Sequence, residues 1–203
     1  NGYGQLTDSY TNTGVYSTGI IGNGKSIQRI INTGNITHIG CCYDTSVTLN
    51  EDNILTIFGS DIQSNSTESF KETNDNVIQF DCGYKHIGFI TNNGKVIMLG
   101  SNYYYQSGIP NSSAQIKKNT LNISSQIDTV KCGVFHTIIK TINDDYYSFG
   151  WNQDHQLLLN NKQHKCLPAL ISMKYVIQTI IGFNAIIIDL IPGYKATYII
   201  TKA

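Results

Sequence analysis

KCGVFHTIIKTINDDYYSFGWN, residues 131–152, decides the fold, because it can be laid without a gap over DCGYKHIGFITNNGKVIMLGSN, residues 81–102. A cysteine, a glycine, a histidine, a late glycine and an asparagine coincide in the two stretches. In order they are Cys82, Gly83, His86, Gly100 and Asn102 in the first, and Cys132, Gly133, His136, Gly150 and Asn152 in the second. Self-similarity at a fixed spacing is the signature of a repeat architecture. The recurring Cys-Gly-x-x-His is thus either a chemical site or a joint between structural units.

Two further stretches extend the repeat. GCCYDTSVTLNEDNILTIFGSD, residues 40–61, fits the same register, with Cys41 on the cysteine and Gly59 on the late glycine. A weaker copy is expected around residues 181–202, with Gly182 on the glycine of the joint and Ala185 in place of the histidine. We predict one domain over residues 1–203 with approximate repeats at 1–35 (incomplete), 36–75, 76–125, 126–174 and 175–203 (incomplete).

Each copy has the pattern of short β-strands. Before Gly83, Phe80 and Cys82 alternate with Gln79 and Asp81, which is the period of a half-buried strand. Two apolar runs then flank a polar turn, TNNG or INDD, which predicts a β-hairpin. A third strand precedes the hairpin, a fourth fits the spacer, and no segment has a strong helical period. The sequence predicts an all-β protein made of four-stranded antiparallel blades, a β-propeller.

The spacers between hairpins carry a recurrence of their own. Asn1, Asn102 and Asn152 are each followed four residues later by a glutamine. These segments link one strand to the next at corresponding places of the repeat. They are the irregular parts of the chain, where binding residues are most often found.

The repeat resembles that of the regulator of chromosome condensation family, whose members form seven-bladed propellers. The residues that carry the resemblance are Val130, Cys132, Gly133, His136, Thr137, Phe149, Gly150, Trp151 and Asn152, with Asn1, Gly4, Gln5 and Leu6 from a preceding link. The resemblance implies a partial propeller of about four C-terminal repeats, because the chain starts in mid-repeat. In the copy at Cys41 the pattern departs, with Cys42 for the glycine and Thr45 for the histidine.

Composition limits the kinds of partner. The 203 residues include 14 basic and 14 acidic side chains, the net charge is zero, and Arg29 is the single arginine. A nucleic-acid binder needs a basic excess, so no direct contact with nucleic acid is expected. Five cysteines, an odd number, indicate free thiols in a reducing compartment. The most apolar run, residues 185–191, is too short to span a bilayer, so we expect a cytoplasmic protein, with the nucleus as an alternative.

The joint itself is expected to be architectural, without metal or cofactor. Its cysteine and histidine lie on different strands and recur in different blades, which prevents convergence on one ion, and no third group marks a histidine as a catalytic base. The adjacent turn acids Asp144 and Asp145 are expected to be solvated. Structural roles are predicted for Cys41, Cys82, Gly83, His86, Gly100, Cys132, Gly133, His136, Gly150 and Trp151. No catalytic residue is predicted.

Partner binding is expected from the links. Tyr103, Tyr104 and Tyr105 cannot all face a core, and aromatic side chains are enriched at protein interfaces. Asp154 and His155 occupy the corresponding link of the next copy, where His164 is also expected to be exposed, and Trp151 is expected to pack between blades.

The favoured function is a non-catalytic protein-interaction propeller, a scaffold or regulatory binding module. The resemblance implies the alternative of a guanine-nucleotide exchange factor for a Ran-like or other small GTPase, which works by binding the nucleotide-free state best. An enzyme that uses His86 and His136 at the central opening is the third possibility.

Overall fold

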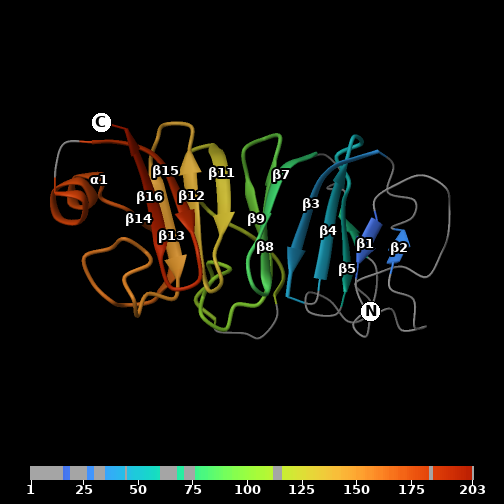
Figure 1. Ribbon diagram of the computed structural model, residues 1–203, viewed down its shortest axis with the longest axis horizontal. Coiled ribbons are helices and arrows are strands. Elements are labelled where there is room, and N and C mark those ends of the chain that lie inside the picture. Colours follow the sequence, from blue (N-terminus) through green and yellow to red (C-terminus); the bar gives the residue numbers. More distant parts are fainter. Residues whose placement is uncertain are drawn as a thin grey trace. The chain divides into compact units, whose positions relative to one another are not determined.

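The computed structural model describes residues 16–18, 27–29, 35–43, 45–59, 68–70, 76–111, 116–182 and 185–202. They fall into two compact units, Asn1–Ile78 and Gln79–Ala203. Figure 1 shows the strands as successive small sheets along the chain. The prediction of an all-β chain with four-stranded antiparallel sheets is confirmed.

The first unit contains a two-stranded and a four-stranded sheet. The two-stranded sheet pairs β1 (Tyr16–Thr18) with β2 (Ile27–Arg29). The four-stranded sheet comprises β3 (Ile36–Cys42), β4 (Thr45–Asn50), β5 (Leu55–Gly59) and β6 (Glu68–Phe70), in sequence order.

The second unit contains two complete sheets and a hairpin. The first sheet comprises β7 (Val77–Cys82), whose first two residues belong to the first unit, with β8 (His86–Thr91), β9 (Val96–Gly100) and β10 (Ile116–Thr120). The second comprises β11 (Ile127–Cys132), β12 (His136–Thr141), β13 (Tyr146–Gly150) and β14 (Lys165–Leu170). The hairpin pairs β15 (Ile186–Pro192) with β16 (Thr197–Lys202).

The strand register reproduces the gap-free alignment of the three strong copies. The residue at the histidine position faces the late glycine across the second and third strands of each sheet. The pairs are Thr45 with Gly59, His86 with Gly100, and His136 with Gly150. The sequence repeat is therefore one structural unit used three times.

The expected register of the last copy was wrong. The amide of Gly193 donates to the carbonyl of Ala196 at 2.8 Å, as Gly133 donates to His136 in the preceding sheet at 2.8 Å. Gly193 and not Gly182 therefore occupies the place of the joint glycine, and Ala196 occupies that of the histidine. Sixty residues separate Gly133 from Gly193, against fifty between Gly83 and Gly133.

A short helical insertion explains the longer step. Helix α1 (Met173–Tyr175) continues into the π-helix η1 (Val176–Ile181), and Gly182 ends it with a φ of 78°. The sequence analysis predicted no helix here, because nine residues are too few for a 3.6-residue period to stand out. Ser172 starts the segment, and its hydroxyl accepts a hydrogen bond from the amide of Tyr175 at 3.3 Å.

Two hydrophobic cores join neighbouring sheets within the second unit. The first contains Met98 of β9 and Phe149 of β13, both fully buried. The second contains Ile138 of β12, Leu190 of β15 and Val176 of the helical insertion. Each sheet is thus buried against the next, which is how radially repeated sheets become stable.

Candidate protein-binding surface

The two joint histidines connect consecutive sheets. His86 Nε2 lies 3.0 Å from Thr137 Oγ1 of the next sheet, and His136 Nε2 lies 3.0 Å from Thr197 Oγ1 of the hairpin that follows. Each threonine hydroxyl donates its proton to a backbone carbonyl, that of Gln106 for Thr137, at 2.8 Å. The oxygen must then accept from the imidazole, so Nε2 carries the hydrogen.

Burial keeps both histidines neutral. It lowers the pKa of His86 to about 3, with a contribution from the neighbouring His136, and it lowers the pKa of His136 to about 4. Both side chains are inaccessible to solvent. A buried imidazole held by a threonine and unable to take up a proton near neutral pH is unsuited to act as a general base, so the geometry favours an architectural joint.

The joint glycine is required by the histidine three residues later. A Cβ atom on Gly133 would lie 2.6 Å from His136 Cε1 and 2.7 Å from the carbonyl oxygen of Gly193. The imidazole is too close to the glycine to leave room for a side chain. Cys-Gly-x-x-His is thus one packing unit.

The burial of the cysteines differs from one copy of the repeat to the next, which the repeat did not predict. Cys132 is buried, and this burial raises its pKa, as expected for a small apolar side chain at the end of a strand. Cys82 is half-buried, whereas Cys41 is exposed. In that copy Cys42, which replaces the joint glycine, is the buried residue.

Buried asparagines shape the two links that the structure describes. Asn102 donates from Nδ2 to the carbonyl of Asn111 at 2.6 Å and accepts the amide of Ser107 at 2.9 Å. Asn152 accepts the amide of Leu157 at 2.9 Å in the same way. Both asparagines have no exposed surface. The link at Asn1 lies outside the described residues.

The glutamine of each link holds the turn that begins at the asparagine four residues earlier. Gln106 Oε1 accepts the amide of Tyr104 at 2.8 Å, and Gln156 Oε1 accepts that of Asp154 at 2.9 Å. Tyr105 takes a left-handed backbone, with a φ of 66°, and the corresponding His155 has a φ of 62°. The recurring Asn-x-x-x-Gln therefore encodes one rigid turn.

Joints and links together form a cluster of aromatic side chains, here called the aromatic surface. It consists of Tyr84, Tyr103, Tyr104, Phe135, Trp151 and Tyr194. Tyr104 lies at its centre, with its ring centroid 4.7 Å from that of Phe135 and 4.6 Å from that of Trp151. Tyr103 and Tyr194 are 61% and 60% exposed. The surface spans both complete sheets of the second unit and its hairpin.

The sequence analysis found part of this surface and missed part. It predicted exposure within the Tyr103–Tyr105 run, and Tyr103 is exposed while Tyr104 and Tyr105 are half-buried. It missed Tyr84 and Tyr194, although Gly-Tyr-Lys recurs at residues 83–85 and 193–195. The wrong register of the last copy concealed that recurrence.

The link that follows Trp151 carries the other predicted binding residues. Asp154 and His155 are exposed. His164 was expected to be exposed, and this is wrong: its ring stacks on Trp151 at 4.7 Å, and its Nδ1 accepts the amide of Asn152 at 3.0 Å. Trp151 itself is half-buried in the aromatic surface.

Lysines adjoin two of the tyrosines. Lys85 Nζ lies 5.8 Å from the ring centroid of Tyr84, and Lys195 Nζ lies 5.7 Å from that of Tyr194. Both distances suit a cation–π contact. The lysines and tyrosines therefore form matching pairs on either side of Phe135.

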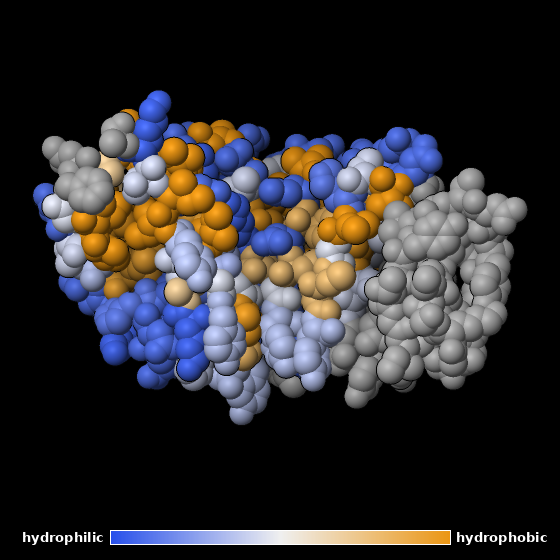
Figure 2. Space-filling model, viewed as in Figure 1, coloured by the Kyte–Doolittle hydropathy of each residue, from blue (hydrophilic) through white to orange (hydrophobic). Residues whose placement is uncertain are grey.

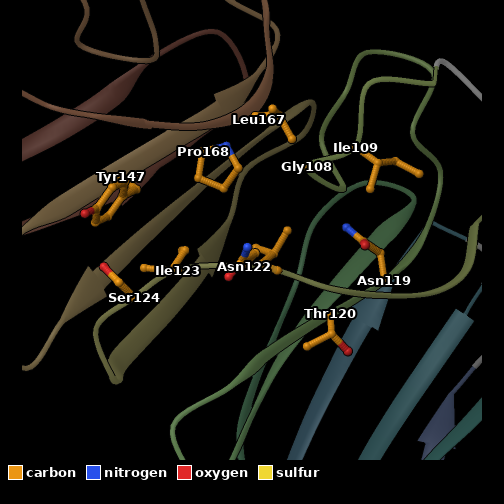
Figure 3. Close-up of a pocket in the computed structure, with 11 residues that line it drawn as sticks. Gly108, Ile109, Asn119, Thr120, Asn122, Ile123, Ser124, Tyr147, Leu167 and Pro168 are labelled. Carbon is orange, nitrogen blue, oxygen red and sulfur yellow. The ribbon is translucent and has the colours of Figure 1, made fainter.

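A groove of about 630 Å³ lies between the two complete sheets (Figure 3). Gly108, Asn119 and Asn122 form one wall, and Tyr147, Leu167 and Pro168 form the other. No carboxylate, histidine, cysteine or lysine lines it. Its walls therefore supply hydrogen bonds and apolar contact but no acid–base chemistry.

Relatives of known sequence match part of the chain. No model of a known protein family matches it. The X-linked retinitis pigmentosa GTPase regulator of Homo sapiens is 31% identical over 115 residues, 55% of this chain and 11% of that protein. The same regulator of Mus musculus is 29% identical over 110 residues, 53% of this chain and 11% of that protein. The chain thus spans about a tenth of the length of the curated relatives it matches.

Solved structures match the fold over most of the chain. Human WBSCR16 gives a TM-score of 0.65 at 21% identity, over 83% of this chain and 48% of that one. Prp20p from Saccharomyces cerevisiae, described with its binding properties to Gsp1p and histones, gives 0.66 at 15% identity, over 82% and 43%. A further structure names the Prp20 protein as yeast RCC1. The shared repeat register, the four-stranded sheets and these matches show that the chain has the fold of a partial β-propeller, with repeats similar to those of the regulator of chromosome condensation family.

Proposed function

We propose that the protein is a non-catalytic interaction module that binds a protein partner through its aromatic surface. The observation that carries this proposal is the gathering of six aromatic side chains from separate joints and links, with Tyr103 and Tyr194 largely exposed. Tyrosine and tryptophan are the side chains most enriched at the centres of protein interfaces.

The rigidity of the supporting turns favours binding. Tyr104 is held by Gln106, and the link that carries it is held by the buried Asn102. Side chains that are already ordered lose less conformational entropy when a partner docks. A surface of this kind can therefore bind without first rearranging.

The charge distribution supports a protein partner over nucleic acid. The chain has no net charge, and two lysines, Lys85 and Lys195, lie beside rings of the aromatic surface. Phosphate backbones are bound by clustered lysine and arginine. Among the described residues no helical segment has the length and hydropathy to cross a bilayer. The five cysteine thiols support a reducing compartment, and we propose the cytoplasm, with the nucleus as the alternative.

Substitution of the two exposed tyrosines tests this assignment. We expect Tyr103→Ala with Tyr194→Ala to lower the recovery of specific partners at least tenfold in quantitative affinity purification, as the loss of two interface aromatics predicts. Ile142→Ala is the matched control, because Ile142 is also exposed but lies at the β12–β13 turn, away from the aromatic surface. Equal recovery with both variants would refute the aromatic surface as the binding site.

Exchange of guanine nucleotide on a small GTPase is the second candidate. It is supported by two relatives: the retinitis pigmentosa GTPase regulator and Prp20p, which is described by its binding to Gsp1p. An exchange factor stabilises the nucleotide-free GTPase and needs no catalytic residue of its own.

Release of fluorescent GDP from a panel of small GTPases tests the second candidate. Faster release with the wild-type chain, lost in the Tyr103→Ala, Tyr194→Ala variant but kept in Ile142→Ala, would assign exchange to the aromatic surface. Unchanged release from every GTPase would remove exchange activity and leave the binding proposal to the affinity experiment.

A further inference from the structure

The groove between the two complete sheets differs from the apolar areas elsewhere on the second unit. A hydrophobic area covers the β15–β16 hairpin in Figure 2, where Ile186 and Tyr198 are among the exposed side chains. The groove is instead hollow, with a volume of about 630 Å³, and both of its walls belong to complete sheets. Sites for small ligands have volumes of about 300–1,000 Å³. The groove is therefore large enough to hold a ligand.

One wall of the groove recurs in the next sheet. Each link closes with the same backbone hydrogen bond, at 3.0 Å, from the amide of Gly108 to Tyr105 and from the amide of Leu158 to His155. At their last two residues, β10 and β14 pair in the same register with β9 and β13. The wall residues Gly108, Ile109, Asn119 and Thr120 therefore correspond to Leu158, Leu159, Ala169 and Leu170.

In the next sheet a segment of the chain itself covers the corresponding wall. Val176 of the helical insertion is fully buried in one core with Leu158 and Leu159, and Tyr175 lines the smaller space of about 310 Å³ that remains. The connection after β10 spans residues 121–126, against residues 171–185 after β14, and it forms no such segment. This fold thus places a peptide segment on a wall that, beside β10, faces an open groove.

The two walls differ in polarity, and this difference predicts the conformation of the occupant. The aliphatic wall offers the insertion apolar contact, which suffices for a helix because its backbone groups are paired internally. The groove offers Asn119 and Asn122, whose side-chain amides carry the same donor and acceptor as a peptide unit. Asn119 Nδ2 donates to the carbonyl of Ser107 at 2.9 Å, which fixes the carboxamide and leaves Oδ1 as an acceptor. An extended segment, whose backbone groups need partners, suits this wall.

The opposite wall determines which side chains the occupant can carry. It presents Tyr147, Pro168 and Leu167, and Leu167 is 53% exposed. Ile109 adds an apolar side chain from the first wall. None of the eleven lining residues is charged, so a charged side chain in the groove would lose hydration without gaining an ion partner. The lining therefore favours an uncharged segment with aliphatic side chains.

We propose that the groove between β10 and β14 binds an extended, uncharged peptide segment of a partner protein. An aliphatic side chain of the segment packs against Leu167 and Ile109, and its backbone bonds to the amides of Asn119 and Asn122. The groove shares no residue with the aromatic surface, so this inference does not depend on the proposed function.

Selection of a phage-displayed library of random seven-residue peptides on the full 203-residue chain tests the proposal. The selected peptides are expected to share aliphatic residues flanked by uncharged ones. A fluorescein-labelled synthetic copy of the leading peptide is expected to bind saturably in fluorescence anisotropy. Leu167→Ala is expected to weaken binding at least fivefold through lost apolar contact, and Asn122→Asp at least tenfold, because it removes a donor and places a charge in the groove.

Leu170→Ala is the matched control, because Leu170 lies on the same strand and is 57% exposed but does not line the groove. It is expected to bind the peptide like the wild type, as is the Tyr103→Ala, Tyr194→Ala variant of the aromatic surface. The proposal is overturned by a selection without a saturable binder, by a charged consensus, or by equal weakening in Leu170→Ala. Binding that is lost in the tyrosine variant but kept in both groove variants would also overturn it.

Discussion

The folded protein is expected to lose stability steeply on acidification from pH 6.5 to about pH 4. His86 and His136 are buried, and burial lowers their pKa values to about 3 and about 4. In the unfolded chain a histidine takes up a proton near pH 6.5. Below that pH the unfolded state binds more protons than the folded state, so acid favours unfolding. Each histidine contributes a slope of up to about 1.4 kcal/mol per pH unit.

Urea unfolding at intervals between pH 7.5 and pH 4.5 measures this effect. The double variant His86→Asn, His136→Asn is expected to be less stable than the wild type at pH 7, because it loses both bonds to Thr137 and Thr197, but to show a flatter pH dependence. His155→Asn is the control, since His155 is exposed. A double variant whose pH slope equals that of the wild type would show that these histidines do not determine acid sensitivity.

The second large effect is expected from Gly133→Ala. Its Cβ would lie 2.6 Å from His136 Cε1 and 2.7 Å from the carbonyl oxygen of Gly193, both too close for contact. Because one obstacle is backbone, the joint must distort, and we expect a loss of roughly 1–3 kcal/mol in the free energy of unfolding. The measurement is the midpoint of urea unfolding at pH 7.5, where both histidines are neutral.

Gly193→Ala is the natural comparison, because the same joint position is followed there by Ala196 in place of histidine. The nearest atom to its added Cβ is Tyr198 Cε2, at 3.0 Å, an aromatic side chain that can move. We expect a loss below about 1 kcal/mol. If Gly193→Ala were as destabilising as Gly133→Ala, the imidazole of His136 could not be the reason that Gly133 does not accept a side chain.

Much of the fold could be predicted from the sequence because each repeat forms the same local contacts, so the same residue pattern recurs several times. The gap-free alignment of Cys82 with Cys132 fixed the strand pairs, since a one-residue slip would turn every side chain to the other face. The last copy could not be aligned in this way. Its histidine is replaced by Ala196 and nine helical residues precede it, so the surviving Gly-Tyr-Lys was assigned to no joint.

By itself, the sequence determined the repeat. Its four-stranded unit, the glycine three residues before the histidine and the Asn-x-x-x-Gln turn are all local patterns. Only the tertiary structure decided which side chains meet. Tyr104, Phe135 and Trp151 come from a link, a joint and a strand end in two sheets, and they touch because those sheets pack face to face. Contacts between sheets join residues that can lie fifty or more positions apart in the sequence, and no local sequence pattern predicts them.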